Sequence, residues 1–448
     1  MNTPYSRRAF LSRGITLAST AWTVPAFIDL SARALAAQVN PAQSSNPGVA
    51  DGRILVVIQL AGGNDGLNTV VPFADPAYYN ARNSIAIPQD QVIKLSGADG
   101  IGLHPKLAAL RDLYDDAQLS IVQGVGYPNP NRSHFKSMDI WHTADTSGTG
   151  EGWLGRYFDN QCAGAPKDAH GHPGAGACSS DAGIALGRTA PLAMEGRIFR
   201  PISFESPDLF RWTGEDMEDP KLKDAYHHIT RGTDQAGEPN TALPANPSHQ
   251  PDNSANFLTR TALDAQIASD RIRRAVERKP ASEYPRTALA RQLQIVASMI
   301  AAEMPTRVYY ASLAGFDTHA GQGNANGTQA NLLEQLAQAI KAFYTDLKQQ
   351  ENDSRVLTMT FSEFGRRVAQ NASNGTDHGT AAPMFLAGPM VRPGVLGNHP
   401  SLTNLDNGDL KFTADFRSVY AGILQQWLRA DPEKVLEGRF SAAKVVKV

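Results

Sequence analysis

Short polar segments stand next to apolar runs at several places in the chain, and together they hold the residue types of a hydrolytic metal site. Carboxylates and neutral imidazoles bind divalent cations, and such a cation activates a serine hydroxyl as a nucleophile at neutral pH. The segments are GGNDG at 62–66, NPNRSHF at 129–135, FDTH at 316–319, SEFGR at 362–366 and TDHG at 376–379. They supply Asp65, Ser133, Asp317, His319, Glu363, Asp377 and His378.

Each candidate also has a structural interpretation. Asp65 lies in a segment rich in Asn, Asp and Gly, which alone favours a turn over a ligand. Asp317 and His319 are two residues apart, so in an extended segment both point to one side and can approach one metal ion. The same pair could be a helix cap and a surface histidine. Ser133 could be a nucleophile or, like Asn131, a helix cap.

Glu363, Arg366, Asp377 and His378 could bind a metal ion, form ion pairs or hold the substrate. Glu363 could bind metal or pair with Arg366, three residues later. The planar guanidinium of Arg366 could instead hold an anionic substrate oxygen. His378 could be a metal ligand, with Asp377 as another ligand or as its hydrogen-bond partner. A serine at a helix N-terminus, such as Ser133, also favours a phosphate or sulfate beside it.

Apolar patterns predict an α/β fold, with a mainly parallel sheet and helices on both faces. β-branched runs indicate strands, periodic runs indicate helices, and the two alternate along the chain. Residues at about 150–285 are less regular and are expected to form an insertion. In such folds the loops at the carboxyl ends of the strands carry the chemistry. Strands are expected at 54–60, 119–125, 307–313, 355–361 and 383–387, and helices at 105–116, 259–279, 285–303, 329–347 and 415–427.

The N-terminus reads as an export signal. Arg7 and Arg8 form a twin-arginine pair, followed by a mildly apolar segment and a small-residue cleavage site at Ala34-Leu35-Ala36. Residues 1–37 are therefore expected to be a signal peptide that engages the twin-arginine translocase and directs the protein to the periplasm or beyond. Residues 38–52 read as a flexible lead-in, and 53–448 as the folded domain.

Composition narrows the class of protein. The 448 residues include 42 basic and 44 acidic ones, so the net charge of −2 gives no reason to expect nucleic acid as a partner. Beyond the N-terminus no apolar stretch is long enough to span a membrane, so we do not expect an integral membrane protein. The two cysteines, Cys162 and Cys178, are expected to form a disulfide worth about 3 kcal/mol. A metal site that adds His170 and His172 is the less favoured alternative.

From about residue 54 to 429 the chain resembles the DUF1501 group within the alkaline-phosphatase-like superfamily of sulfatases and phosphatases. The resemblance implies that fold, with Asp65, Asp317, His319, Glu363 and His378 as metal ligands and Ser133 as nucleophile. The carrying segments are LVVIQLAGGNDGLNTVVP, GLHP, GYPNPNRSHF, GFDTH, TFSEFGR and TDHGTAAPMFLAGP.

The sequence departs from the superfamily pattern at three points, one of which is that the formylglycine sulfatase signature C/S-x-P-x-R is absent around Ser133. Asp317-Thr318-His319 is tighter than the usual D-x-x-x-H, and Phe364 stands where an imidazole is expected. These residues predict a hydrolase of a small anionic ester, a phosphate or sulfate, or of a glycan. It would use Ser133 and one or two divalent ions such as Zn, Mn, Ca or Fe. Arg366, or as the less favoured alternative Arg132, would hold the substrate oxygens. The alternatives are a non-catalytic envelope protein that binds a surface partner, and a phosphotransferase or isomerase on the same scaffold.

Overall fold

The computed structural model describes residues 52–164, 180–207 and 268–447. The expected signal peptide, the lead-in up to residue 51, Cys178 and much of the middle region lie outside these ranges. In the described part of the chain, none of the helices combines the length and the apolar character needed to cross a membrane.

A nine-stranded sheet forms the centre of the molecule, in the order β11-β5-β10-β9-β1-β8-β6-β7, with β14 also paired to β5. Strand β10 runs antiparallel to both of its neighbours, whereas the other pairings in the sheet are parallel. The mainly parallel sheet expected from the apolar runs is thus confirmed. The strands are β1 (Ile54–Ala61), β5 (Leu119–Gly126), β6 (Gly183–Leu186), β7 (Ile202–Phe204), β8 (Val308–Ala314), β9 (Val356–Phe361), β10 (Ala382–Ala387), β11 (Gly394–Leu396) and β14 (Ala414–Asp415).

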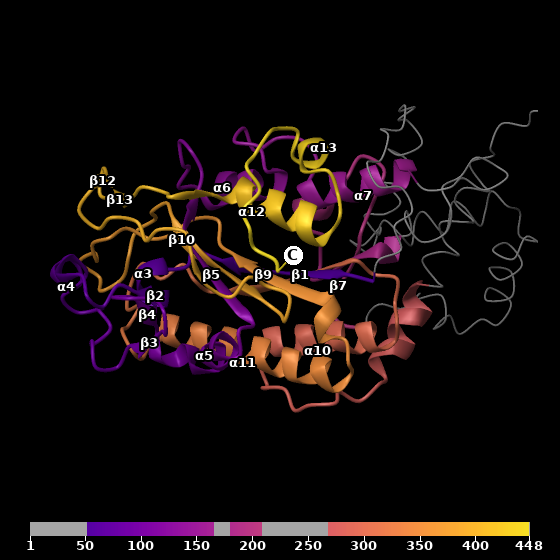
Figure 1. The fold of residues 1–448 in the computed structure, drawn as a ribbon, viewed down its shortest axis with the longest axis horizontal. Coiled ribbons are helices and arrows are strands. Elements are labelled where there is room, and N and C mark those ends of the chain that lie inside the picture. The colour runs from indigo at the N-terminus through magenta and orange to yellow at the C-terminus, as the bar shows by residue number, and fades with distance from the viewer. Residues whose placement is uncertain (1–51, 165–179, 208–267, 448) are drawn as a thin grey trace, which may run out of the picture.

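Helices cover both faces of the sheet because its buried strands present apolar side chains on both sides. In β1, Val56 and Ile58 pack into one core, whereas Leu55 and Val57 pack into the other. Figure 1 shows the first layer below the sheet and the second above it. The first layer holds α5 (Ala108–Asp115), α10 (Ala288–Ala301) and α11 (Thr328–Gln349), and the second holds α6 (His134–Thr143), α7 (Trp153–Gly164), α12 (Phe416–Gly422) and α13 (Pro432–Leu436).

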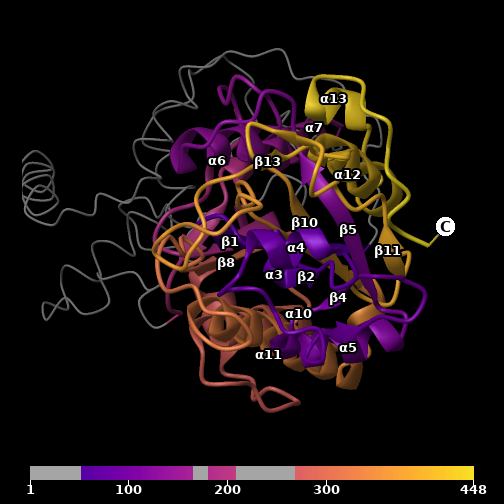
Figure 2. The same ribbon diagram turned by 90° about the vertical axis from the view of Figure 1, so that its left-hand side faces the viewer.

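Several polar loops meet at one edge of the sheet. The parallel strands β1, β8 and β9 are in register, so they end together. Because β10 is antiparallel, the segment that precedes it arrives at the same edge as the segments that follow its neighbours. Figure 2 looks onto this end of the molecule. Smaller elements lie there: α3 (Gly66–Thr69), α4 (Pro76–Ala81), β2 (Val70–Val71), β3 (Ile93–Lys94), β4 (Gly102–Leu103), β12 (Leu405–Asp406) and β13 (Asp409–Leu410).

Part of the expected insertion belongs to the central sheet. Strand β6 pairs with β8, and β7 pairs with β6, both in parallel. These strands are short, which explains why residues 183–204 lack a strong sequence period. Helix α7 is amphipathic, and its Cys162 is disulfide-bonded, while the expected partner Cys178 lies outside the described residues.

Candidate metal centre

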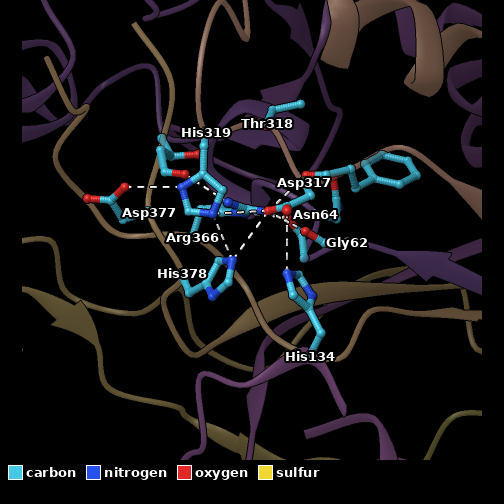
Figure 3. A network of polar contacts seen from close by, with 12 residues as sticks. Gly62, Asn64, His134, Asp317, Thr318, His319, Arg366, Asp377 and His378 are labelled. Carbon is cyan, nitrogen blue, oxygen red and sulfur yellow. Dashed lines mark hydrogen bonds and ion pairs between the residues drawn. The ribbon is translucent and has the colours of Figure 1, made fainter. Parts of the chain in front are cut away.

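Three histidines converge on the carboxylate of Asp317. The Nε2 atom of His319 lies 3.1 Å from Asp317 Oδ1. That of His378 lies 3.3 Å from the same oxygen, and that of His134 lies 3.6 Å from Oδ2. Figure 3 shows the four side chains facing one another. They come from the loop after β8, the segment before β10 and the first turn of α6.

The opposite ring nitrogen of each histidine has its own acceptor. The Nδ1 atom of His134 lies 2.7 Å from Glu363 Oε1, and that of His319 lies 3.2 Å from Asp377 Oδ1. The Nδ1 atom of His378 lies 2.8 Å from the backbone oxygen of Arg132. These acceptors place the hydrogen on Nδ1, so each neutral imidazole directs the lone pair of Nε2 towards Asp317.

The close approach of the histidine Nε2 atoms and the Asp317 carboxylate requires a positive charge between them. The Nε2 atoms of His319 and His378 are only 2.9 Å apart, and a carboxylate oxygen lies beside both. Lone pairs so close repel one another unless a proton or a metal ion lies between them. Ligands at right angles around an ion at about 2.1 Å are about 3.0 Å apart, so the spacing fits a shared metal ion. His134, Asp317 and His378 also have ligand atoms within 4.8 Å of one another.

Glu363 and Asp377 lie behind the histidines. The side chain of Glu363 is 2% exposed, and its Oε1 also accepts a hydrogen bond from Gly62 N at 2.9 Å. Asp377 Oδ1 also accepts from Asn371 Nδ2 at 3.0 Å. Carboxylates so placed orient a metal-binding imidazole and raise its basicity. Glu363, expected as a ligand, thus contacts His134, and Asp377, expected as a ligand or as the partner of His378, contacts His319.

Asp65 is separated from this group by its own partners. It is fully buried, and its Oδ2 accepts from Arg82 Nη1 at 2.5 Å and from Gln322 Nε2 at 2.6 Å. Its Oδ1 accepts from the backbone of Leu67 and caps α3. Arg82 compensates the charge of this buried carboxylate, and the cap of α3 matches the turn interpretation, whereas the metal-ligand role stays a prediction.

Arg366 is also placed differently from the expectation. Its side chain is fully buried, and it donates to Asp317 Oδ1 at 2.6 Å. The other acceptors are backbone carbonyls in the loops around the centre, so the guanidinium is enclosed by protein and cannot hold a substrate oxygen. These carbonyls belong to Gly62, Gly63, Phe316 and Thr376. Arg366 therefore connects the segments that carry the candidate ligands.

Ser133 lies at the edge of the centre. It is the N-cap residue of α6, but its hydroxyl makes no capping hydrogen bond. Asn131 Oδ1 instead accepts from the backbone N–H of Ser133 at 2.8 Å. The serine is exposed and stands between Arg132, whose carbonyl holds His378, and the ligand candidate His134.

Phe364 packs against the centre where an imidazole was expected. It is buried, and its ring centroid lies 4.9 Å from that of His134 and 4.6 Å from that of His378. A Cβ atom on Gly63 would come within 2.4 Å of the Phe364 ring. Gly63 therefore has to be a glycine for Phe364 to reach the histidines.

Electrostatics favour the ligand forms of two residues. Burial alone would raise the pKa of Asp317, but the hydrogen bond and charge of Arg366, with His378 and His319, lower that pKa overall. Burial lowers the pKa of His378 and outweighs the opposite effects of the Arg132 carbonyl and Asp317. A charged carboxylate and a neutral imidazole are the forms that bind metal.

The sequence does not single out His134 as a ligand. It follows Ser133 directly, and it is the only one of the three histidines that comes from the region before the middle insertion. Its position on the first turn of α6, after β5, was the available signal. The glutamate that binds it is far away in the chain, and no spacing pattern connects the two.

Comparison with known proteins gives one family match and distant structural neighbours. A family model described as "Protein of unknown function (DUF1501)" matches residues 228–437, which include Asp317, His319, Glu363 and His378. No curated protein matches the chain in sequence. The crystal structure of Ps i-CgsB in complex with k-i-k-neocarrahexaose is 14% identical with a TM-score of 0.31, and the match covers 78% of this chain and 69% of that one. The lipoteichoic acid synthase LtaP from Listeria monocytogenes is 11% identical with a TM-score of 0.24, over 80% of this chain and 71% of that one.

Proposed function

We propose that this protein is an exported, metal-dependent hydrolase of phosphate or sulfate esters with Ser133 as its nucleophile. The observation that carries the proposal is the convergence of His134, His319 and His378 on Asp317, with the exposed Ser133 next to His134 in the chain. A divalent cation held there would stabilise an anionic ester and lower the pKa of a nearby hydroxyl. His134, Asp317 and His378 have ligand atoms close enough together to hold one such ion.

The donor set narrows the choice of ion. Three imidazole nitrogens and one carboxylate suit zinc, iron or manganese, whereas calcium prefers a shell of oxygen ligands. Glu363, Asp377 and the Arg132 carbonyl keep the three Nε2 atoms available as ligands.

Ser133 would act from the first turn of α6. Its Oγ atom would attack the phosphorus or sulfur, the alcohol would leave with a proton, and water would then hydrolyse the ester formed on the serine. The free N–H groups of this helix terminus favour the negative charge of the ester group. The substrate is expected to be a small anionic ester or a charged glycan, and the signal peptide would supply the route of export.

The test combines metal analysis with hydrolysis of aryl phosphates and aryl sulfates. We expect about one transition-metal ion per chain, and loss of the ion in a His378→Ala variant because this removes one of the residues that could hold it. His399→Ala is the matched control, since His399 bonds only the backbone oxygen of Pro400 among the described residues. Ser133→Ala should keep the ion and lose hydrolysis.

The outcomes separate the rival functions. A metal-free, well-folded protein without esterase activity would favour a non-catalytic envelope protein. Undiminished hydrolysis by Ser133→Ala would remove the nucleophile assignment. An ester product formed with an added acceptor alcohol would identify a phosphotransferase.

A further inference from the structure

We propose that Arg132 and Arg367, joined through Asp409, bind the anionic group of the substrate at this centre. The inference rests on the proposed function for the class of substrate, and it assigns the recognition that buried Arg366 cannot provide.

The two arginines share one buried carboxylate. Arg132 Nη2 forms an ion pair with Asp409 Oδ2, and Arg367 Nε lies 3.6 Å from Asp409 Oδ1. The Asp409 side chain is 1% exposed, whereas the arginine side chains are 42% and 38% exposed. The aspartate is thus an internal anchor, and both guanidinium groups reach solvent.

Arg132, Arg367 and Asp409 together retain a positive charge and N–H donors that Asp409 does not occupy. Two guanidinium groups and one carboxylate leave one positive charge. Each guanidinium has five N–H donors, and Asp409 is the ionic partner of both among the described residues. The arrangement therefore leaves exposed donors with the fork geometry that suits phosphate or sulfate.

Backbone contacts tie both arginines to the metal centre. Arg132 precedes Ser133, and its carbonyl oxygen lies 2.8 Å from His378 Nδ1. Arg367 donates its backbone N–H to the carbonyl of Asp377 at 3.0 Å.

A purely structural role is the competing explanation. Asp409 belongs to β13, so the ion pairs could serve only to hold the β12–β13 hairpin against the sheet. Such a clip would not need two half-exposed arginines, and its loss would lower stability without changing anion binding.

The experiment measures binding of inorganic phosphate and inorganic sulfate to the metal-loaded protein by calorimetry at constant ionic strength. Arg132→Ala and Arg367→Ala should each weaken binding of the preferred anion roughly tenfold, because a charge-assisted hydrogen bond is lost. Metal content should stay at the wild-type level. Arg439→Ala is the control, since Arg439 forms an exposed ion pair with Glu433 outside the centre.

Glutamine variants cover the case in which alanine disturbs folding. Arg367→Gln and Arg132→Gln keep a donor for Asp409 but remove the charge. Wild-type anion affinity in folded variants at both positions, or no anion binding by the wild-type protein, would overturn the inference.

Hydrolysis assays distinguish failure of the anion site from failure of the proposed function. Anion binding that depends on the arginines, without ester hydrolysis, would reject the proposed function and keep the anion site. Hydrolysis with a KM that is insensitive to both arginines would reject the anion site alone.

Discussion

At the scale of single residues, the centre separates atoms that face the ion from atoms that orient them. Asp317 faces the three imidazoles, while Glu363 and Asp377 each hold the far nitrogen of one ring. The sequence identifies the acids and histidines of the centre. It does not show which of them face the ion and which lie behind a histidine. Glu363 is buried beneath His134 because Gly62 N and His134 Nδ1 both need an acceptor there.

Replacing Glu363 by glutamine should weaken metal binding roughly 10–100-fold, the usual effect of losing a carboxylate behind a ligand histidine. The variant keeps the shape of the side chain but removes the charge that favours Nδ1–H on His134. Affinity would be measured by competition with a chromogenic chelator. Glu334→Gln is the control, because Glu334 pairs only with Lys106 in the described structure and is 38% exposed. Equal affinities in the two variants would show that the charge of Glu363 does not contribute to metal binding through His134.

At the scale of elements, the turn after β1 brings three loops together. Gly62 has a φ of +119°, and a Cβ there would lie 2.4 Å from the backbone N of Asp317. Gly63 has a φ of +78° and faces the Phe364 ring. The glycines of this segment therefore make space for neighbouring protein segments rather than for an ion.

A Gly63→Ala variant should therefore be less stable than a Gly97→Ala variant. Gly97 has a similar φ of +74° but nothing within 4 Å of an added Cβ, so its substitution measures backbone strain alone, on the order of 1 kcal/mol. Gly63→Ala adds a clash with a buried ring and should lower the free energy of unfolding by a further ~1–3 kcal/mol. Urea titration of both variants makes the comparison, and equal losses would show that Phe364 moves aside freely.

The sequence predicts where the strands lie, but it does not predict that β10 runs antiparallel to its neighbours. The runs at 54–60, 307–313 and 355–361 became β1, β8 and β9 with small shifts at their ends. The rule that carboxyl ends meet at one edge placed Asp317 and Glu363 correctly near each other. The rule does not explain why His378, which precedes β10, lies with them. Hydrogen bonds of β10 to β5 and β9 set the antiparallel direction of β10, and these strands are far apart in the chain.

At the scale of the whole molecule, two apolar cores fix the sheet whose strand ends carry the polar loops of the centre. The cores lie on opposite sides of the sheet, and their members come from nearly every described helix. Local patterns predict this layering because successive apolar side chains along a strand point to opposite faces of the sheet. They say nothing about buried ion pairs such as Asp65 with Arg82, which form only when distant segments pack.

Buried histidines should make the whole fold sensitive to acid. Burial lowers the pKa of His142 from 6.5 to about 4, and burial also lowers the pKa of His104. His142 Nε2 lies 3.1 Å from the hydroxyl of Tyr310, which donates to Gln59, so the imidazole donates through Nε2 and has no described partner for a second proton. The unfolded chain therefore binds protons more readily than the folded one as the pH falls below the ordinary histidine range.

The sign of the effect follows from that difference. The stability contributed by neutral His142 is fully present above about pH 6.5 and is lost as the pH falls towards about 4, by roughly 3 kcal/mol in total. A His142→Gln variant keeps a donor for Tyr310 but cannot titrate, so its unfolding free energy should fall less steeply over that interval. Denaturant titrations with chelator present exclude protons released at the metal centre. If the two proteins lost stability in parallel, His142 would have to be charged, or solvated, in the folded state.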